Sequence, residues 1–97
     1  MEVCCTSLED VRYHIDGIDR ELVTLLARRG HLVAQAAGFK KTTDDVRAPA
    51  RVEAVITKVR ALASETGASP RVVEQVYRAM IAAFIDEELK THAELIR

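Results

Sequence analysis

An apolar seam through the first third of this 97-residue chain constrains its fold more than any other sequence feature. Apolar or small residues recur there at intervals of three and four positions: Leu8, Val11, Ile15, Ile18, Leu22, Leu25, Leu32, Ala36 and Phe39. This heptad-like spacing predicts a long amphipathic helix. Thr6 and Glu9 are spaced as a capping box, and residues 42–45 favour turns. We therefore expect the helix to run from about Ser7 to about Lys41.

A helix of this length is too long for the rest of one short chain to cover. About 35 residues at about 1.5 Å each make a rod of about 50 Å. Gly17, Gly30 and Gly38 lower the helix propensity, but the seam stays in phase across all three, so we expect an unbroken helix. A small domain buries only a modest core by itself. We therefore expect a second copy to cover the rod in a symmetric dimer.

Two shorter helices are predicted after a loop at residues 42–48. Pro49 is a first-turn proline that opens the second helix, and Gly67 ends it. Ser69 is the expected N-cap of the third helix, with Pro70 in its first turn. No strand pattern or repeat is present in the sequence. The predicted fold is all-α, with one long and two shorter helices in residues 7–97 and a disordered tail at residues 1–6.

The net charge and the hydropathy of the chain exclude some classes of binding partner. A net charge of −1 gives no overall field that would attract nucleic acid or anionic lipid. No apolar run approaches the roughly 20 residues of a membrane span, and the first residues lack the basic and apolar regions of a signal peptide. We expect a cytoplasmic protein that binds neither nucleic acid nor a membrane.

No metal site is predicted from the cysteines and histidines. Cys4 and Cys5 are adjacent and have no further Cys to pair with, so neither a disulfide framework nor a four-ligand zinc site follows from them. His14, His31 and His92 show no metal-ligand spacing with one another. We expect the two cysteines to be tail residues without a function.

Charged residues interrupt the apolar seam of the long helix. Arg29 stands between Leu25 and Leu32, where an apolar residue is expected. A buried guanidinium requires an anion or carboxylate, so Arg29 is an internal ion pair, a register device or a ligand-binding group. On one continuous helix Lys40 would return to within about 20° of the same face, about 16 Å along the axis. The two cations are then placed to bind one small anionic molecule.

Three further charged residues are candidates for the same chemistry. Arg12 borders the seam about 25 Å from Arg29, so it can join that site only from an antiparallel partner chain. Glu88 ends an apolar stripe on the third predicted helix, either as a salt-bridge partner for a core cation or as a neutral acid that donates a hydrogen bond. Arg51, early in the second predicted helix, is a surface residue or one more cation of the site.

The order and spacing of these residues resemble the all-α chorismate mutases, whose fold isochorismate pyruvate lyases also use. The matching pieces are Leu8-x-x-Val11-Arg12-x-x-Ile15-Asp16-x-Ile18-Asp19, Leu25-Leu26-x-x-Arg29, Phe39-Lys40, Pro49-x-Arg51-Val52, Val73-x-x-Val76-Tyr77-x-x-Met80-Ile81 and Glu88. The resemblance implies an intertwined homodimer with two identical active sites. Each site would be completed by an Arg from the other subunit's long helix.

The resemblance also implies a role for each charged residue. Arg12 of the partner subunit and Arg29 would hold the substrate carboxylates, with Arg51 assisting. Lys40 would hydrogen-bond the ether oxygen of the breaking bond. Glu88 stands where bacterial relatives usually carry Gln, the second donor to that oxygen, and it can donate only when protonated. The implied reaction is the Claisen rearrangement of chorismate to prephenate, which requires no cofactor and no metal.

Two alternatives remain open. The string Ala48-Pro49-Ala50-Arg51-Val52 is more like the lyase branch, which splits isochorismate into salicylate and pyruvate, whereas Glu88 favours the mutase. The third reading is a non-enzymatic helical dimer whose seam charges only set the register. We predict a chorismate mutase, with the lyase as its nearest rival.

Overall fold

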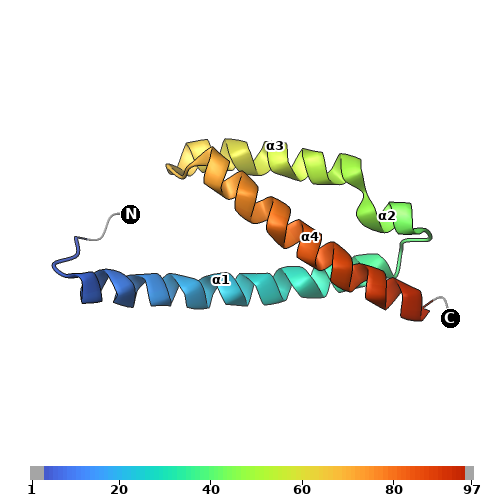
Figure 1. The fold of residues 1–97 in the computed structure, drawn as a ribbon, viewed down its shortest axis with the longest axis horizontal. Coiled ribbons are helices and arrows are strands. Elements are labelled where there is room, and N and C mark those ends of the chain that lie inside the picture. Colours follow the sequence, from blue (N-terminus) through green and yellow to red (C-terminus); the bar gives the residue numbers. More distant parts are fainter. Residues whose placement is uncertain (1–3, 96–97) are drawn as a thin grey trace. The chain divides into compact units, whose positions relative to one another are not determined.

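The structure is a computed structural model that describes residues 4–95, apart from the side chains of His92 and Leu95. The helices in this range are α1 (Leu8–Ala37), α2 (Thr43–Arg47), α3 (Pro49–Thr66) and α4 (Pro70–Leu95) (Figure 1). Residues 4–95 contain no strand, and none of their helices is long and apolar enough to cross a membrane. The all-α prediction with one long and two shorter helices is confirmed, and α2 is an additional single turn.

The chain divides into two compact units, Met1–Leu32 and Val33–Arg97, which are described separately. Part of the predicted disordered tail, residues 1–3, lies outside the described residues, so that expectation stays a prediction. Residues 4–7 precede the first helix without regular structure.

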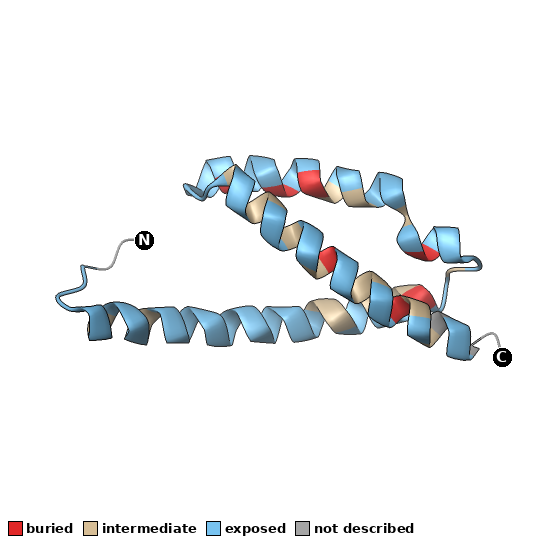
Figure 2. Cartoon of the chain, viewed as in Figure 1, coloured by how far each residue is buried: buried red, intermediate tan, exposed pale blue. Residues whose placement is uncertain are grey.

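The first unit consists of a single helix, the greater part of α1. Ser7 Oγ accepts a hydrogen bond from the Asp10 backbone N–H at 3.0 Å, so Ser7 is the N-cap rather than the expected Thr6. The helix continues through Gly17 and Gly30 without a break, as predicted. All the seam residues of this unit are exposed: Leu8, Val11, Ile15, Ile18, Leu22, Leu25 and Leu32 (Figure 2). One helix has no second element of its own unit against which to bury an apolar side.

The end of α1 differs from the prediction, because the helix stops at Ala37 instead of about Lys41. The backbone N–H groups of residues 38–40 each donate to the carbonyl three residues earlier, at 3.0–3.3 Å, which is a tighter turn than an α-helix. Gly38 weakens the helix at this point. Lys40 therefore lies in the connection after α1, and the expectation that Arg29 and Lys40 share a face of one helix is wrong.

The next segment, expected to be a loop, contains α2. Thr42 and Asp45 form a capping box in which Thr42 Oγ1 accepts from the Asp45 N–H at 3.0 Å. The backbone N–H groups of Lys41 and Thr42 donate to the Asp45 carboxylate, which holds the pKa of Asp45 below its ordinary value. Val46 is buried, and α2 packs against α4. These bonds begin a new helix where a loop was expected.

Helices α3 and α4 form an antiparallel pair (Figure 1), and both ends of α3 and the start of α4 agree with the sequence prediction. Gly67 ends α3 at φ 79°, a left-handed conformation that suits glycine, and donates its N–H to the Ala63 carbonyl. Ser69 Oγ accepts from the Val72 N–H at 3.3 Å and caps α4. The buried apolar side chains of the pair are Ile56, Val59, Ala63 and Ile81 (Figure 2).

An ion-pair network links α3 to α4 at the surface. Arg78 donates two hydrogen bonds to Glu53, both at 2.9 Å, and one to Glu74 at 2.8 Å. Arg60 donates to the other oxygen of Glu74 at 2.6 Å. Arg78 lowers the pKa of Glu53, and together with Arg60 it lowers the pKa of Glu74. Exposed ion pairs contribute little individually, but this network connects two helices through several bonds.

Candidate active site

The predicted site residues are divided between the two units. Arg12 and Arg29 lie on α1 in the first unit, whereas Lys40, Arg51 and Glu88 lie in the second. The unbroken helix separates Arg12 from Arg29 by about 25 Å along its axis, as expected. Within the second unit, the structure brings Lys40 and Glu88 into contact.

Lys40 and Glu88 form an ion pair inside the second unit. Lys40 Nζ lies 2.6 Å from Glu88 Oε2, and the Glu88 side chain is only 4% exposed while that of Lys40 is 25% exposed. Glu88 is carried by α4, and Lys40 by the turn between α1 and α2. Of the two readings offered for Glu88, the salt bridge with a cation is the one present in the structure. The chain therefore sets an ammonium group beside a buried carboxylate.

One carboxylate oxygen of this pair lacks a well-aligned hydrogen-bond donor. Glu88 Oε2 is buried and accepts no hydrogen bond of good geometry from the described residues, even though Lys40 Nζ is close to it. A buried oxygen without a well-aligned donor is costly. A buried ion pair is also costly unless further hydrogen bonds satisfy both groups.

Arg51 occupies the first turn of α3 and is exposed. The preceding residues fix where this turn begins, because Ala48 has a left-handed backbone with φ 38° and Pro49 is the first helical residue. Within the described part of the chain Arg51 has no ion pair. It is therefore placed on a defined turn with its guanidinium open to solvent.

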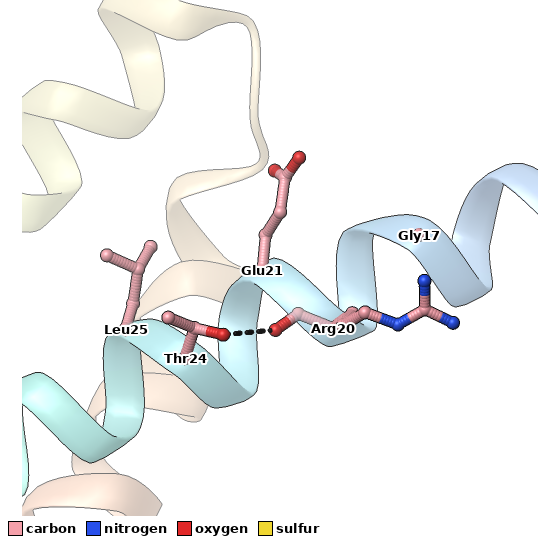
Figure 3. A pocket seen from close by; sticks show the side chains of 5 residues that line it. All are labelled: Gly17, Arg20, Glu21, Thr24 and Leu25. Atoms are coloured by element: carbon pink, nitrogen blue, oxygen red, sulfur yellow. Dashed lines mark hydrogen bonds between the residues drawn. The ribbon is translucent and has the colours of Figure 1, made fainter.

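A shallow hollow on α1 is lined by residues that the sequence analysis did not assign to a site. It is lined by Gly17, Arg20, Glu21, Thr24 and Leu25 (Figure 3). The absence of a side chain at Gly17 leaves open space, and Thr24 Oγ1 donates to the Arg20 carbonyl at 2.9 Å. All five residues belong to one helix, which cannot enclose a ligand by itself. We assign no function to this hollow.

Known proteins match this chain over most of its length. The family model described as Chorismate mutase type II matches residues 11–89, a range that includes all five candidate residues. The isochorismate pyruvate lyase of Pseudomonas aeruginosa is 36% identical over 86 residues, which are 89% of this chain and 85% of that protein. The T-protein of Haemophilus influenzae is 37% identical over 73 residues, which are 74% of this chain but only 19% of the T-protein.

Proposed function

Because this chain belongs to the chorismate mutase type II family, we propose that it is a chorismate mutase that rearranges chorismate to prephenate. The family and the similar proteins indicate an enzyme of the chorismate mutase or isochorismate pyruvate lyase kind. The observation that carries the proposal is the Lys40–Glu88 pair, a cation positioned by a buried carboxylate within the matched region. Both reactions break the same ether bond, and a fixed cation suits that step.

The rearrangement requires positioning and charge stabilisation rather than a nucleophile. The carbon–oxygen bond between the ring and the enolpyruvyl group breaks while a carbon–carbon bond forms between the enolpyruvyl methylene and the ring. Negative charge grows on the ether oxygen in the transition state. A preorganised donor at that oxygen lowers the barrier, because it stabilises the transition state more than the ground state.

Lys40 is the proposed donor to the ether oxygen. An ammonium group has three N–H donors, so it can contact a carboxylate and an ether oxygen together. Its contact with Glu88 fixes the end of an otherwise flexible side chain before substrate arrives.

Arginine side chains are proposed to hold the two carboxylates of the substrate. Arg29 binds one, Arg12 of the partner subunit binds the other, and Arg51 assists. Guanidinium groups suit this task because their planar fork binds a carboxylate through two hydrogen bonds. The dimer that this requires is supported by the exposed seam of α1, which a second copy would bury. The site is then incomplete in a single chain.

The lyase is the second candidate, and two observations favour it. The similar lyase matches this chain over nearly its whole length, and the string from Ala48 to Val52 is of the lyase type. In that reaction the same ring–oxygen bond of isochorismate breaks and a ring hydrogen moves to the enolpyruvyl methylene. The products, salicylate and pyruvate, account for all atoms of the substrate.

Incubation of the purified protein with each substrate tests the proposal. With chorismate we expect prephenate, detected after its acid conversion to phenylpyruvate. With isochorismate, salicylate fluorescence above the uncatalysed rate would favour the second candidate if its kcat/KM exceeded that for chorismate. Formation of neither product would overturn both and leave the non-enzymatic helical dimer.

A further inference from the structure

Three side chains of zinc-ligand type meet at the start of α1, away from the residues assigned to catalysis. A thiol, a carboxylate and an imidazole, from Cys5, Asp10 and His14, offer one ligand atom each, and these atoms all lie within 4.8 Å of one another. We propose that this cluster binds Zn²⁺ through three protein ligands, with a fourth position left for water or another group. The proposal replaces the sequence-based expectation that the chain has no metal site.

The distances require only a small adjustment on metal binding. Tetrahedral zinc with bonds of about 2.0–2.3 Å places its ligand atoms about 3.3–3.8 Å apart. His14 Nε2 already lies 3.5 Å from Asp10 Oδ1, because the two residues are one helical turn apart on the same face. Cys5 precedes the helix and is exposed, so its thiol can approach without disturbing α1.

Neighbouring groups orient the proposed ligands. The Thr6 backbone N–H donates to Asp10 Oδ2 at 3.2 Å, which fixes the carboxylate with its other oxygen toward His14. The Tyr13 ring meets the His14 ring edge to face, with centroids 5.4 Å apart and planes at 79°. Hydrogen bonds and packing of this kind around a metal site orient its ligands and strengthen binding.

The donor set selects the class of ion. Thiolate and imidazole ligands favour zinc and similar transition metals, whereas Mg²⁺ and Ca²⁺ prefer sites made of oxygen atoms. Three protein ligands leave zinc an open position. All three ligands lie within the first unit and none is Arg12, Arg29 or Lys40, so metal binding can be tested without an enzyme assay.

Sequence reasoning missed the cluster because its spacing matches no common metal motif. Cys5 stands outside the helix, and the turn at residues 6–7 returns its thiol to the face that carries Asp10 and His14. The sequence places Asp10 and His14 four positions apart, as one face of a helix requires, but it shows no such spacing for Cys5. The third ligand depends on the course of the chain before the helix.

Metal binding to the full-length protein tests the proposal directly. We expect calorimetric titration of metal-free protein with Zn²⁺ to give one ion per chain with a micromolar dissociation constant. Co²⁺ should give the near-ultraviolet charge-transfer band that marks a thiolate ligand. Cys5→Ser and His14→Ala should each weaken Zn²⁺ binding by at least about tenfold, since each removes a direct ligand.

Matched controls are available in the same chain. Cys4→Ser removes the adjacent exposed thiol, and His31→Ala removes an exposed imidazole of the same helix. Both variants should bind Zn²⁺ as the unaltered protein does, with unchanged helix content by circular dichroism. The proposal is overturned if Zn²⁺ binds no more tightly than millimolar, if Co²⁺ gives no charge-transfer band, or if the controls weaken binding as much as the ligand variants.

Discussion

The two units of the chain differ in how far their apolar residues are buried. In the second unit Ile56, Val59 and Ile81 are buried where α3 and α4 pack against each other. In the first unit Ile18, Leu22 and Leu25 are 55%, 51% and 53% exposed along a single helix. The second unit therefore has a core of its own, whereas the apolar seam of the first unit is exposed along its whole length. This difference supports the proposal that a second copy of the chain covers the seam and completes the site.

Replacing Lys40 should have the largest effect on activity. Removing one preorganised donor to a developing oxyanion typically lowers kcat by about 10²–10³. We expect a loss of this order for Lys40→Ala. Lys41→Ala is the matched control, because Lys41 is the adjacent exposed lysine, and it should retain full kcat. An active Lys40→Ala enzyme would remove Lys40 from the mechanism.

Arg29→Ala separates catalysis from a purely structural role of the first unit. If Arg29 binds a substrate carboxylate, the variant should lose about tenfold to a hundredfold in kcat/KM, the usual range for a charge-assisted hydrogen bond. Its oligomeric state by light scattering should stay unchanged. Arg28→Ala, at the neighbouring exposed position, is the control. A shift in oligomeric state with turnover intact would instead identify Arg29 as a register device.

Leu22→Asp tests whether the exposed seam of α1 is an interface. A charge buried there without a partner costs several kcal/mol, so we expect the dimer to dissociate at micromolar concentrations. Thr24→Asp places the same charge on the opposite side of the helix and should leave the dimer intact. The measurement is light scattering coupled to size-exclusion chromatography. A dimeric Leu22→Asp protein would show that the seam is not the interface.

Glu88 links the core of the second unit to the activity through its ion pair with Lys40. Glu88→Ala removes the carboxylate that positions the Lys40 ammonium group, so we expect kcat/KM to fall. Glu88→Gln should retain more activity, because its amide oxygen can still accept from Lys40 and its amide nitrogen can donate to the ether oxygen. Equal kcat/KM in Glu88→Ala and in the unaltered enzyme would exclude Glu88 as the residue that positions Lys40.

The smallest effect concerns the surface network on the second unit. Arg78 lowers the pKa values of Glu53 and Glu74 in the folded protein below their ordinary value of about 4.5. Their contribution to stability is therefore complete above about pH 4.5 and is lost as the pH falls through the lowered values. The thermal midpoint should drop less between pH 7 and pH 3 in Arg78→Ala than in the unaltered protein. Arg71→Ala, a second exposed arginine of α4, should show the full drop.

Local signals in the sequence were enough to predict most of the helices. Pro49, Gly67 and Ser69 mark the ends of α3 and the beginning of α4 because they act on their own neighbouring backbone groups. The heptad spacing likewise predicted the unbroken course of α1 through Gly17 and Gly30. The family resemblance and the candidate site residues were likewise predicted from the order and spacing of residues along the chain.

The sequence pattern missed the end of α1 because the segment that follows it begins a helix of its own. The seam continues in phase to Phe39, but the capping box of Thr42 and Asp45 begins a new helix and α1 ends at Ala37. As a result Lys40 lies in a turn, where its ammonium group reaches the buried carboxylate of Glu88.

The amino-acid sequence by itself determined the helical class, the long amphipathic α1 and most helix ends, because these depend on residues within a few positions of one another. Only the tertiary structure decided that Lys40 meets Glu88 and that Cys5 meets Asp10 and His14. Those contacts depend on the direction in which the chain turns before and after its helices. That direction is set by backbone hydrogen bonds and packing, which the spacing of residues along the chain does not encode.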